Sequence, residues 1–457
     1  MSVPTPATGG SSPTGVPPAA GSANRLDPYV DRYAARTRGM TASEIRALFA
    51  VASRPEVVSL AGGMPYLAAL PMNAIADMIG ELTARTGVTA LQYGSGQGNP
   101  VLREAICQVM ALEGIQAGPD DVVVTVGSQQ ALDLVTRIFC DPGDVVLAEA
   151  PSYVGALGTF ASYQVDVVHV PLDDDGLVPG ALQEAIDRLA REGRRAKFLY
   201  TVPNYHNPAG VSLALERRRE ISRICQAANL LILEDNPYGL LGFDGDPLPA
   251  LRAEQEDGII YLGSFSKTFA SGLRVGWALA PRGVKEKLVL AAEASVLCPP
   301  SYTQAIVAEY LATQPWQQQI KVYREIYRER RDAMLSSLEQ LLPATCTWTK
   351  PTGGFYVWAT LPEGVDAKAM LPRAVQARVA YVPGIAFYAD GGGAGHMRLS
   401  YCYPDPDRIH EGVRRLAGVL EEEMELLETF GVQPPPAGLM PGPAQPTSAS
   451  APGPDLS

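Results

Sequence analysis

Short apolar runs alternate with amphipathic stretches through the middle of this 457-residue chain. The runs are rich in β-branched residues and end in polar residues or glycine, which predicts buried β-strands. The stretches at 128–140 and 214–228 have apolar residues at helical spacing. Strands alternating with helices predict an α/β fold whose mostly parallel sheet is covered by helices on both faces. The strand segments are 121–126, 144–149, 165–170, 196–202 and 230–235.

The pattern changes after residue 300. A long, charged, amphipathic stretch at 301–342 predicts helix, and the later segments TWTKPTGGFYVWATL, YVPGIAFY and MRLSYCY predict a smaller α+β domain. Both ends of the chain are rich in Pro, Gly, Ser and Ala, which is typical of disordered tails. The predicted division is a tail at 1–24, an N-terminal segment at 25–60 that joins the small domain, a large domain at 61–300, a connecting helix with the small domain at 301–432, and a tail at 433–457.

Polar residues gather where the predicted strands end. Ser128 follows the first strand, 151–153 follow the second, 204–207 follow the fourth, and Asp235 ends the fifth. In a parallel sheet the carboxyl ends of the strands lie along one edge, and ligands bind beyond that edge. The sequence therefore predicts a ligand site built from these turns.

Composition narrows the class of ligand and the compartment. The formal net charge of -12 and the pI near 5.0 argue against nucleic acid or an anionic membrane as the main partner. No apolar run has the roughly 18 residues of a membrane span. The six cysteines form no C-x-x-C pair and the four histidines have no metal-ligand spacing, so no metal site is expected. These features predict a cytoplasmic enzyme that acts on small molecules.

The segment YLGSFSKTFASGLRVGW at 261–277 places Lys267 between two strand-like ends, with serines and Arg274 nearby. Lysine is rarely buried, and a surface turn is the ordinary explanation for a single lysine. An amine that is partly desolvated near other cations has a lowered pKa and can form a Schiff base with an aldehyde. The segment therefore indicates an aldehyde ligand.

Other candidates match the remaining groups of pyridoxal phosphate, which carries an aldehyde, a phosphate and a pyridinium ring. Arg274 suits a phosphate, and the turn into the helix at Ser128 offers free N–H groups to it. Asp235 is suited to pair with the ring nitrogen. Taken singly, Asp235 could cap a helix and Arg398 could form a structural ion pair, so the inference depends on the sites occurring together.

In these motifs the chain resembles the fold-type I, class I aminotransferases that use pyridoxal phosphate. More narrowly, it is similar to the subgroup of 2-aminoadipate, aromatic and kynurenine aminotransferases. The resemblance covers nearly the whole predicted folded region, and it implies that fold type I. The motifs are SLAGGMP (59–65), LQYGSGQG (91–98), GSQQALDL (127–134), APSYVGA (150–156), TVPNYHNPAG (201–210), EDNPYG (234–239), GSFSKTFASGLRVGW (263–277) and MRLSY (397–401).

The resemblance implies a role for each matching position. Lys267 holds the cofactor aldehyde, Asp235 bonds the ring nitrogen and Tyr153 stacks on the ring, and these three are the expected catalytic residues. Tyr238 and Asn207 bond the phenolic oxygen of the ring. The phosphate is surrounded by Ser128, Gln129, Ser264, Ser266 and Arg274.

The resemblance also implies a substrate site and a partner subunit. Arg398 binds the substrate α-carboxylate, with Asn207, Gly62 and Gly63 lining the substrate site. Tyr93 reaches the phosphate from the neighbouring subunit, which implies a homodimer with shared active sites. The expected reaction moves the amino group of an L-amino acid to a 2-oxo acid, with 2-oxoglutarate as the expected acceptor, by a ping-pong mechanism.

Substrate preference is expected to depend on the segment at 36–49. Aminoadipate-preferring relatives place an arginine four residues before the serine that corresponds to Ser43; here that position is Gly39, and Arg38 precedes it. This shift weakens the aminoadipate interpretation. A pocket of Tyr66, Leu67, Tyr153 and Phe387 would accept aromatic or aliphatic donors, so broad specificity is expected.

Three alternatives stay open. The same scaffold and the same Lys267, Asp235 and Arg398 could serve a lyase or a decarboxylase. A biosynthetic-cluster aminotransferase would use the same mechanism on an unusual amino acid. Some transcription regulators fuse this fold to an N-terminal DNA-binding domain, and the residues before Arg25 show neither a helix-turn-helix pattern nor a basic cluster, which disfavours that interpretation.

Overall fold

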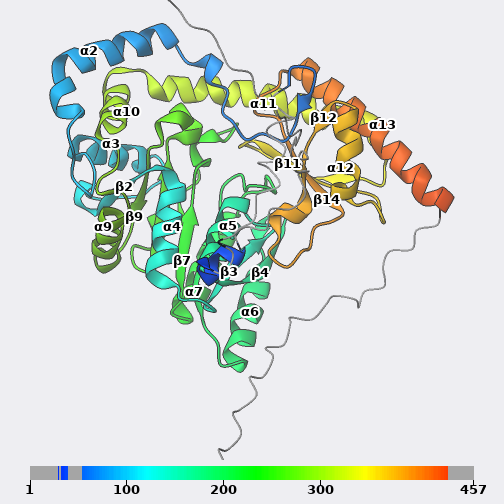
Figure 1. The fold of residues 1–457 in the computed structure, drawn as a ribbon, viewed down its shortest axis with the longest axis horizontal. Helices are drawn as coiled ribbons and strands as arrows, with labels where there is room; N and C mark the ends of the chain where they lie inside the picture. The colour runs from blue at the N-terminus through cyan, green and yellow to red at the C-terminus, as the bar shows by residue number, and fades with distance from the viewer. Residues whose placement is uncertain (1–28, 30–31, 40–53, 431–457) are drawn as a thin grey trace, which may run out of the picture.

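A computed structural model describes residues 29, 32–39 and 54–430 of the chain. The two predicted tails and most of the segment at 36–49 lie outside the described residues. Figure 1 shows two lobes joined by a long helix. The boundaries between the domains stay a prediction.

The larger lobe is built on an eight-stranded sheet with the order β2-β9-β8-β7-β6-β3-β4-β5. Six strands are parallel, and β9 and β5 run antiparallel to their neighbours. The predicted α/β fold with a mostly parallel sheet is confirmed. The bounds are β2 (Val122–Thr125), β3 (Val145–Ala150), β4 (Asp166–Asp173), β5 (Gly176–Leu177), β6 (Ala196–Thr201), β7 (Leu231–Asp235), β8 (Ile259–Ser264) and β9 (Gly276–Leu279).

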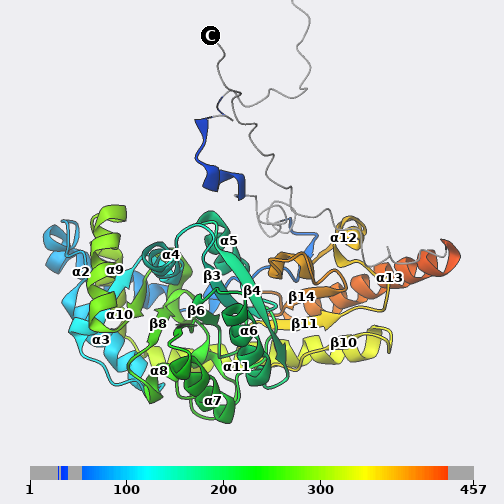
Figure 2. The same cartoon turned by 90° about the horizontal axis from the view of Figure 1, so that it is seen from below.

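Helices cover both faces of this sheet because alternate strand residues point to opposite sides. In β3, Val145 and Leu147 join the core that contains helices α6 and α7, whereas Val146 and Ala148 join the core of α4 and α5. Figure 2 shows these two pairs of helices on opposite sides of the strands. Their bounds are α4 (Gly127–Phe139), α5 (Val154–Ser162), α6 (Pro179–Arg191) and α7 (Leu215–Ala227), with the single-turn α8 (Leu251–Glu254) beside α7.

The smaller lobe is built on an antiparallel sheet of order β10-β11-β14-β13. A separate parallel pair joins β1 (Val58–Ser59) to β12 (Val379–Ala380), so the chain just before the larger lobe is paired with a strand of the smaller one. The remaining elements are β10 (Thr347–Trp348), β11 (Tyr356–Thr360), α12 (Ala367–Gln376), β13 (Val382–Pro383) and β14 (His396–Ser400).

Long helices connect the two lobes. The predicted helical stretch at 301–342 is divided into α10 (Ser301–Thr313) and α11 (Trp316–Leu341), and the break falls at Pro315, which lacks a backbone N–H for a helical bond. Helix α11 extends to the smaller lobe and packs along α13 (Pro406–Phe430) (Figure 1). At the other end, α10 packs on α2 (Met72–Ala90) and α3 (Pro100–Ala111), and α9 (Arg282–Val296) packs on α4.

No helix in the described ranges is both long and apolar enough to cross a membrane. The carboxyl ends of β2, β3, β6, β7 and β8 lie along one edge of the larger sheet. The candidate residues of these strand ends are therefore brought to one place by the sheet itself.

Candidate active site

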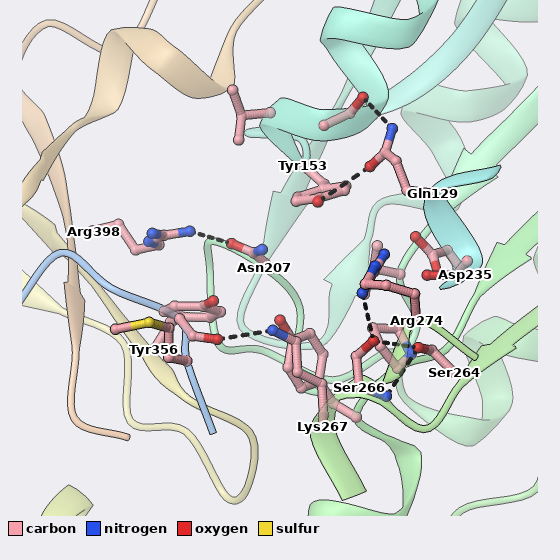
Figure 3. A pocket seen from close by; sticks show the side chains of 18 residues that line it. Gln129, Tyr153, Asn207, Asp235, Ser264, Ser266, Lys267, Arg274, Tyr356 and Arg398 are labelled. Atoms are coloured by element: carbon pink, nitrogen blue, oxygen red, sulfur yellow. Dashed lines mark hydrogen bonds between the residues drawn. The ribbon is translucent and has the colours of Figure 1, made fainter. Parts of the chain in front are cut away.

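The carboxyl edge of the larger sheet and the smaller sheet enclose a cavity of about 400 Å³ (Figure 3). It contains residues from five strand ends of the larger lobe and from β11 and β14 of the smaller lobe. The sequence-predicted residues that line it are Gly63, Ser128, Gln129, Tyr153, Asn207, Asp235, Tyr238, Ser264, Ser266, Lys267, Arg274 and Arg398.

Lys267 lies in the connection between β8 and β9, two antiparallel neighbours in the middle of the sheet. After Ser264 the chain makes a π-helical turn over Ser266–Ala270, and Arg274 adopts a left-handed backbone conformation (φ 53°) before β9 begins. The turn places the Lys267 amine in the cavity, where Nζ donates a 2.8 Å hydrogen bond to the carbonyl oxygen of Gly63.

The electrostatic surroundings of Lys267 favour the neutral amine. Burial lowers its pKa to about 8, and the cations of Arg398 and Arg274 act in the same direction, while Cys402 and Asp235 oppose them. A neutral amine has the lone pair that a nucleophile or a general base needs. The predicted lowering of the Lys267 pKa is therefore present in the structure.

Asp235 ends β7 and is buried. Its Oδ2 accepts a 2.9 Å hydrogen bond from the hydroxyl of Tyr200, and its Oδ1 has no hydrogen-bond partner. Burial raises the pKa of Asp235 to about 6, against the hydrogen bond from Tyr200 and the charge of Lys267. A buried acceptor without a partner is costly, so Oδ1 indicates a site for a donor supplied by a ligand.

A corner rich in hydrogen-bond donors lies where α4 begins. Ser264 Oγ donates to Ser266 Oγ at 2.9 Å, and Arg274 Nη1 donates to Ser266 Oγ at 3.1 Å. Ser128 and Gln129 lie in the first turn of α4, whose N–H groups have no helical partner. Gly127 is required here, because its φ is +73° and an added Cβ would lie 2.9 Å from Cζ of Arg274.

Tyr153 precedes α5 on the side of the cavity that faces Gln129. Its hydroxyl donates to Gln129 Oε1 at 3.3 Å, and Gln129 Nε2 donates to Thr159 Oγ1 at 2.9 Å and to the carbonyl oxygen of Gly155 at 3.1 Å, so three hydrogen bonds orient the amide of Gln129. Burial raises the pKa of Tyr153 to about 12. The phenol therefore remains protonated and the ring forms a neutral wall of the cavity.

Arg398 reaches the cavity from β14 of the smaller sheet. Its Nη1 donates to Asn207 Oδ1 at 2.8 Å and its Nη2 to the carbonyl oxygen of Ala61 at 2.7 Å, while Nε has no partner. The guanidinium lies over the ring of Tyr356, with Cζ 4.2 Å from the ring centroid. The cation is thus held in place from both lobes with donors still available for an anion.

Several cavity residues were missed by the sequence analysis. Tyr356 supports Arg398, but the motif TGGFYVW only indicated a strand, and nothing in it distinguishes a cavity aromatic from a core one. Tyr200 does not line the cavity but contacts Asp235 from the neighbouring strand β6, which only the pairing of β6 with β7 reveals. The other unpredicted lining residues are Met64, Val154, Gly155, Val202 and Pro237.

Some predicted residues lie elsewhere. Gly62 does not line the cavity, and its carbonyl oxygen instead faces Cys402 Sγ at 3.7 Å. Tyr93 is 78% exposed and lines a different cavity, between α2, α3 and α10. Of the predicted pocket, only Tyr153 lines the cavity. Leu67 is 37% exposed, and Phe387 is buried beside Arg398. Gly39 ends a 3-10 turn at Ala35–Gly39, and Ser43 lies outside the described residues.

Among the described residues, no group of His, Cys, Asp or Glu is placed to hold a metal ion.

The chain is similar to known proteins in both sequence and fold. The family described as aminotransferase class I and II matches residues 55–416. An aromatic-amino-acid aminotransferase of Thermococcus litoralis is 41% identical over 399 residues, which are 87% of this chain and 96% of that protein.

Two solved structures share the fold. One is the kynurenine aminotransferase of Pyrococcus horikoshii, solved in complex with PMP, KYN and KYA. The two chains superimpose with a TM-score of 0.83 at 39% sequence identity, and the match covers 86% of this chain and 98% of that one. The other is the α-aminoadipate aminotransferase of Thermus thermophilus, solved in complex with N-(5'-phosphopyridoxyl)-L-leucine. Its TM-score to this chain is 0.81 at 35% sequence identity, and the match covers 87% of this chain and 99% of that one. The chain therefore belongs to the class I and II aminotransferases, a family of pyridoxal-phosphate-dependent enzymes.

Proposed function

We propose that this aminotransferase accepts aromatic and aliphatic L-amino acids as donors and 2-oxoglutarate as acceptor, in two half-reactions of a ping-pong mechanism. An amino acid and a 2-oxo acid are its substrates as a member of the family. The observation that carries the proposal is Arg398, a buried cation with free donors that faces the amine of Lys267 across one cavity. The names of relatives that act on aromatic amino acids, kynurenine and aminoadipate support a broad donor range.

The residues of the cavity fit pyridoxal phosphate. The unpartnered Oδ1 of Asp235 fits the protonated ring nitrogen, and the corner of Ser264, Ser266 and Arg274 at the start of α4 fits the phosphate. We propose that Tyr238 and Asn207 hold the phenolic oxygen, and that Tyr153 covers the ring. When bound, the cofactor withdraws the electrons of the Cα–H bond into its ring.

The protein's own groups then have defined tasks. Lys267 Nζ would hold the cofactor through its aldehyde, and once free this amine would take the proton from substrate Cα. Arg398 binds the α-carboxylate and fixes Cα near Lys267. The bond from Arg398 to Asn207 ties the carboxylate site to the cofactor side of the cavity. Gly63, through its carbonyl oxygen, orients the amine of Lys267.

The substrate side-chain pocket remains a prediction, because the segment at 40–53 is outside the described residues. The position of Gly39, without a side chain that could meet a distal carboxylate, supports aromatic and aliphatic donors over aminoadipate. A lyase or decarboxylase reaction and an unusual biosynthetic substrate use the same Lys267 and Arg398, so product analysis decides between them.

We expect the purified enzyme, incubated with a panel of L-amino acids, to form glutamate only when 2-oxoglutarate is added. The Lys267→Ala variant is the control and should lose at least about 10³-fold in rate, because the base and nucleophile are removed together. Release of ammonia or carbon dioxide without an oxo-acid acceptor would instead assign a lyase or a decarboxylase. Glutamate formation by Lys267→Ala at the parental rate would contradict the role of Lys267.

The lowered pKa of the Lys267 amine is testable on the cofactor-free protein. The amine-reactive probe trinitrobenzenesulfonate should modify Lys267 with a half-maximal rate near pH 8, because the lowered pKa frees the lone pair at lower pH than in an ordinary lysine. Peptide mapping by mass spectrometry measures each lysine in one digest, and Lys321, exposed on α11, is the internal reference. A Lys267 profile with its midpoint near pH 10.5 would contradict the lowered pKa.

We further propose that the enzyme is a homodimer in which Tyr93 completes the phosphate site of the partner. Support comes from an exposed apolar surface around Tyr93, with Val88 at 93%, Leu91 at 71% and Val101 at 62% exposure. Monomeric proteins rarely leave such a patch in water.

The six cysteines have no disulfide partner, which supports our proposal of a cytoplasmic enzyme.

Light scattering should give twice the chain mass of 48.7 kDa for the parent protein. Leu91→Asp should shift the protein to the monomer, because it places a charge in the apolar contact, and should weaken cofactor binding about tenfold or more. Val322→Asp, at an exposed apolar position on α11, is the matched control and should leave the mass unchanged. A fully active parental monomer would exclude the shared site.

A further inference from the structure

The two oxygens of Asp235 have different surroundings. Oδ2 accepts a hydrogen bond from the Tyr200 hydroxyl at 2.9 Å, whereas Oδ1 has no partner in the protein. Tyr200 itself is fully buried and does not line the cavity. Its hydroxyl therefore bonds the carboxylate of Asp235 from the side that faces away from the cavity.

The hydroxyl is fixed in position by the sheet and by its packing. Tyr200 lies in β6 opposite Leu233 of β7, so it is a diagonal neighbour of Asp235 on the same face of the sheet, and its hydroxyl reaches that carboxylate. The ring of Phe160 meets it edge-on at 5.7 Å between centroids. The next residue, Thr201, donates to the buried carboxylate of Glu149 at 2.7 Å, which holds the end of β6. Tyr200 thus has little freedom to turn away.

Electrostatics determine which partner donates. Burial and the charge of Asp235 raise the pKa of Tyr200 well above its ordinary value, so the phenol keeps its proton and donates it in the hydrogen bond to Asp235. The other groups that act on this pair are Lys267, Tyr153 and Glu149. Burial favours the protonated form of Asp235, and the hydrogen bond from Tyr200 favours the carboxylate.

We propose that Tyr200 is a positioning residue that occupies Oδ2 of Asp235, so that the ionised carboxylate presents Oδ1 to the ring nitrogen of the cofactor and keeps that nitrogen protonated. The proposal rests on the proposed role of Asp235. Tyr200 does not touch the cofactor in this arrangement; it acts through the carboxylate.

The variant Tyr200→Phe removes only the hydroxyl and keeps the buried ring. Oδ2 then becomes an unpartnered acceptor in a dry site, which increases the proton affinity of the carboxylate. The proton shared between Asp235 and the ring nitrogen therefore moves toward Asp235. The rate of Cα proton removal should fall about ten- to hundredfold, the loss expected for one hydrogen bond to a charged group.

Tyr261 provides a matched control. Its hydroxyl donates to Glu113 Oε2 at 2.8 Å, the pair is also buried, and Tyr261 lies on β8, beside β7. Neither residue lines the cavity. Tyr261→Phe therefore removes a tyrosine hydroxyl that donates to a buried carboxylate other than Asp235. Its effect reports what the loss of such a hydroxyl costs the structure alone.

The direct readout is the ¹⁵N chemical shift of ring-labelled pyridoxal phosphate bound to each protein. Tyr200→Phe should move the signal toward that of the unprotonated ring nitrogen, and Tyr261→Phe should leave it at the parental value. Thermal melting checks that each variant is folded. If Tyr200→Phe does not fold, 3-fluorotyrosine placed at position 200, a stronger donor, should shift the signal in the opposite direction.

The variant Asp235→Asn distinguishes a failure of the proposed role of Tyr200 from a failure of the proposed role of Asp235. A parental signal in Tyr200→Phe, together with a large change in Asp235→Asn, would overturn the role of Tyr200 and leave that of Asp235 intact. Parental signals in both variants would overturn the role of Asp235 itself. Equal shifts in Tyr200→Phe and Tyr261→Phe would show a general effect of lost packing and would also overturn the inference.

Discussion

The desolvated amine of Lys267 is the constraint on which the site depends. A lysine at the end of a central strand loses hydration, and the cations of Arg398 and Arg274 disfavour its charged form further, so its pKa falls to about 8. The same arrangement in an ordinary core would only destabilise the fold. Here it gives an amine that loses its proton more easily than an ordinary lysine, beside the buried cation of Arg398 and the corner formed by Ser264, Ser266 and Arg274.

The two lobes contribute different parts of this arrangement. The parallel strands of the larger sheet bring Asp235, Ser264 and the start of α4 to one edge, where the cofactor fits. The smaller sheet contributes Arg398 on β14 and Tyr356 beneath it. The hydrogen bond between Arg398 and Asn207 joins the lobes across the cavity. Motion between the lobes would therefore change the shape of the cavity.

Local patterns predicted what local sequence can encode. The strands, α4, α7 and the polar strand ends were predicted because apolar periodicity and turn residues lie within a few positions of one another. The antiparallel direction of β9 was not predicted, since strand pairing is decided by distant residues. Tyr200 and Tyr356 were missed for the same reason: each lies in an apolar strand motif, and only the neighbouring strand shows what its hydroxyl or ring contacts.

The central claim is that Lys267 carries the cofactor in the resting enzyme. Borohydride reduction of the holoenzyme, followed by peptide mapping, tests it most directly, because reduction makes the link between amine and cofactor permanent. We predict that the peptide containing Lys267 carries the added mass of the phosphopyridoxyl group. No added mass at Lys267, or the mass on a different lysine, would contradict it.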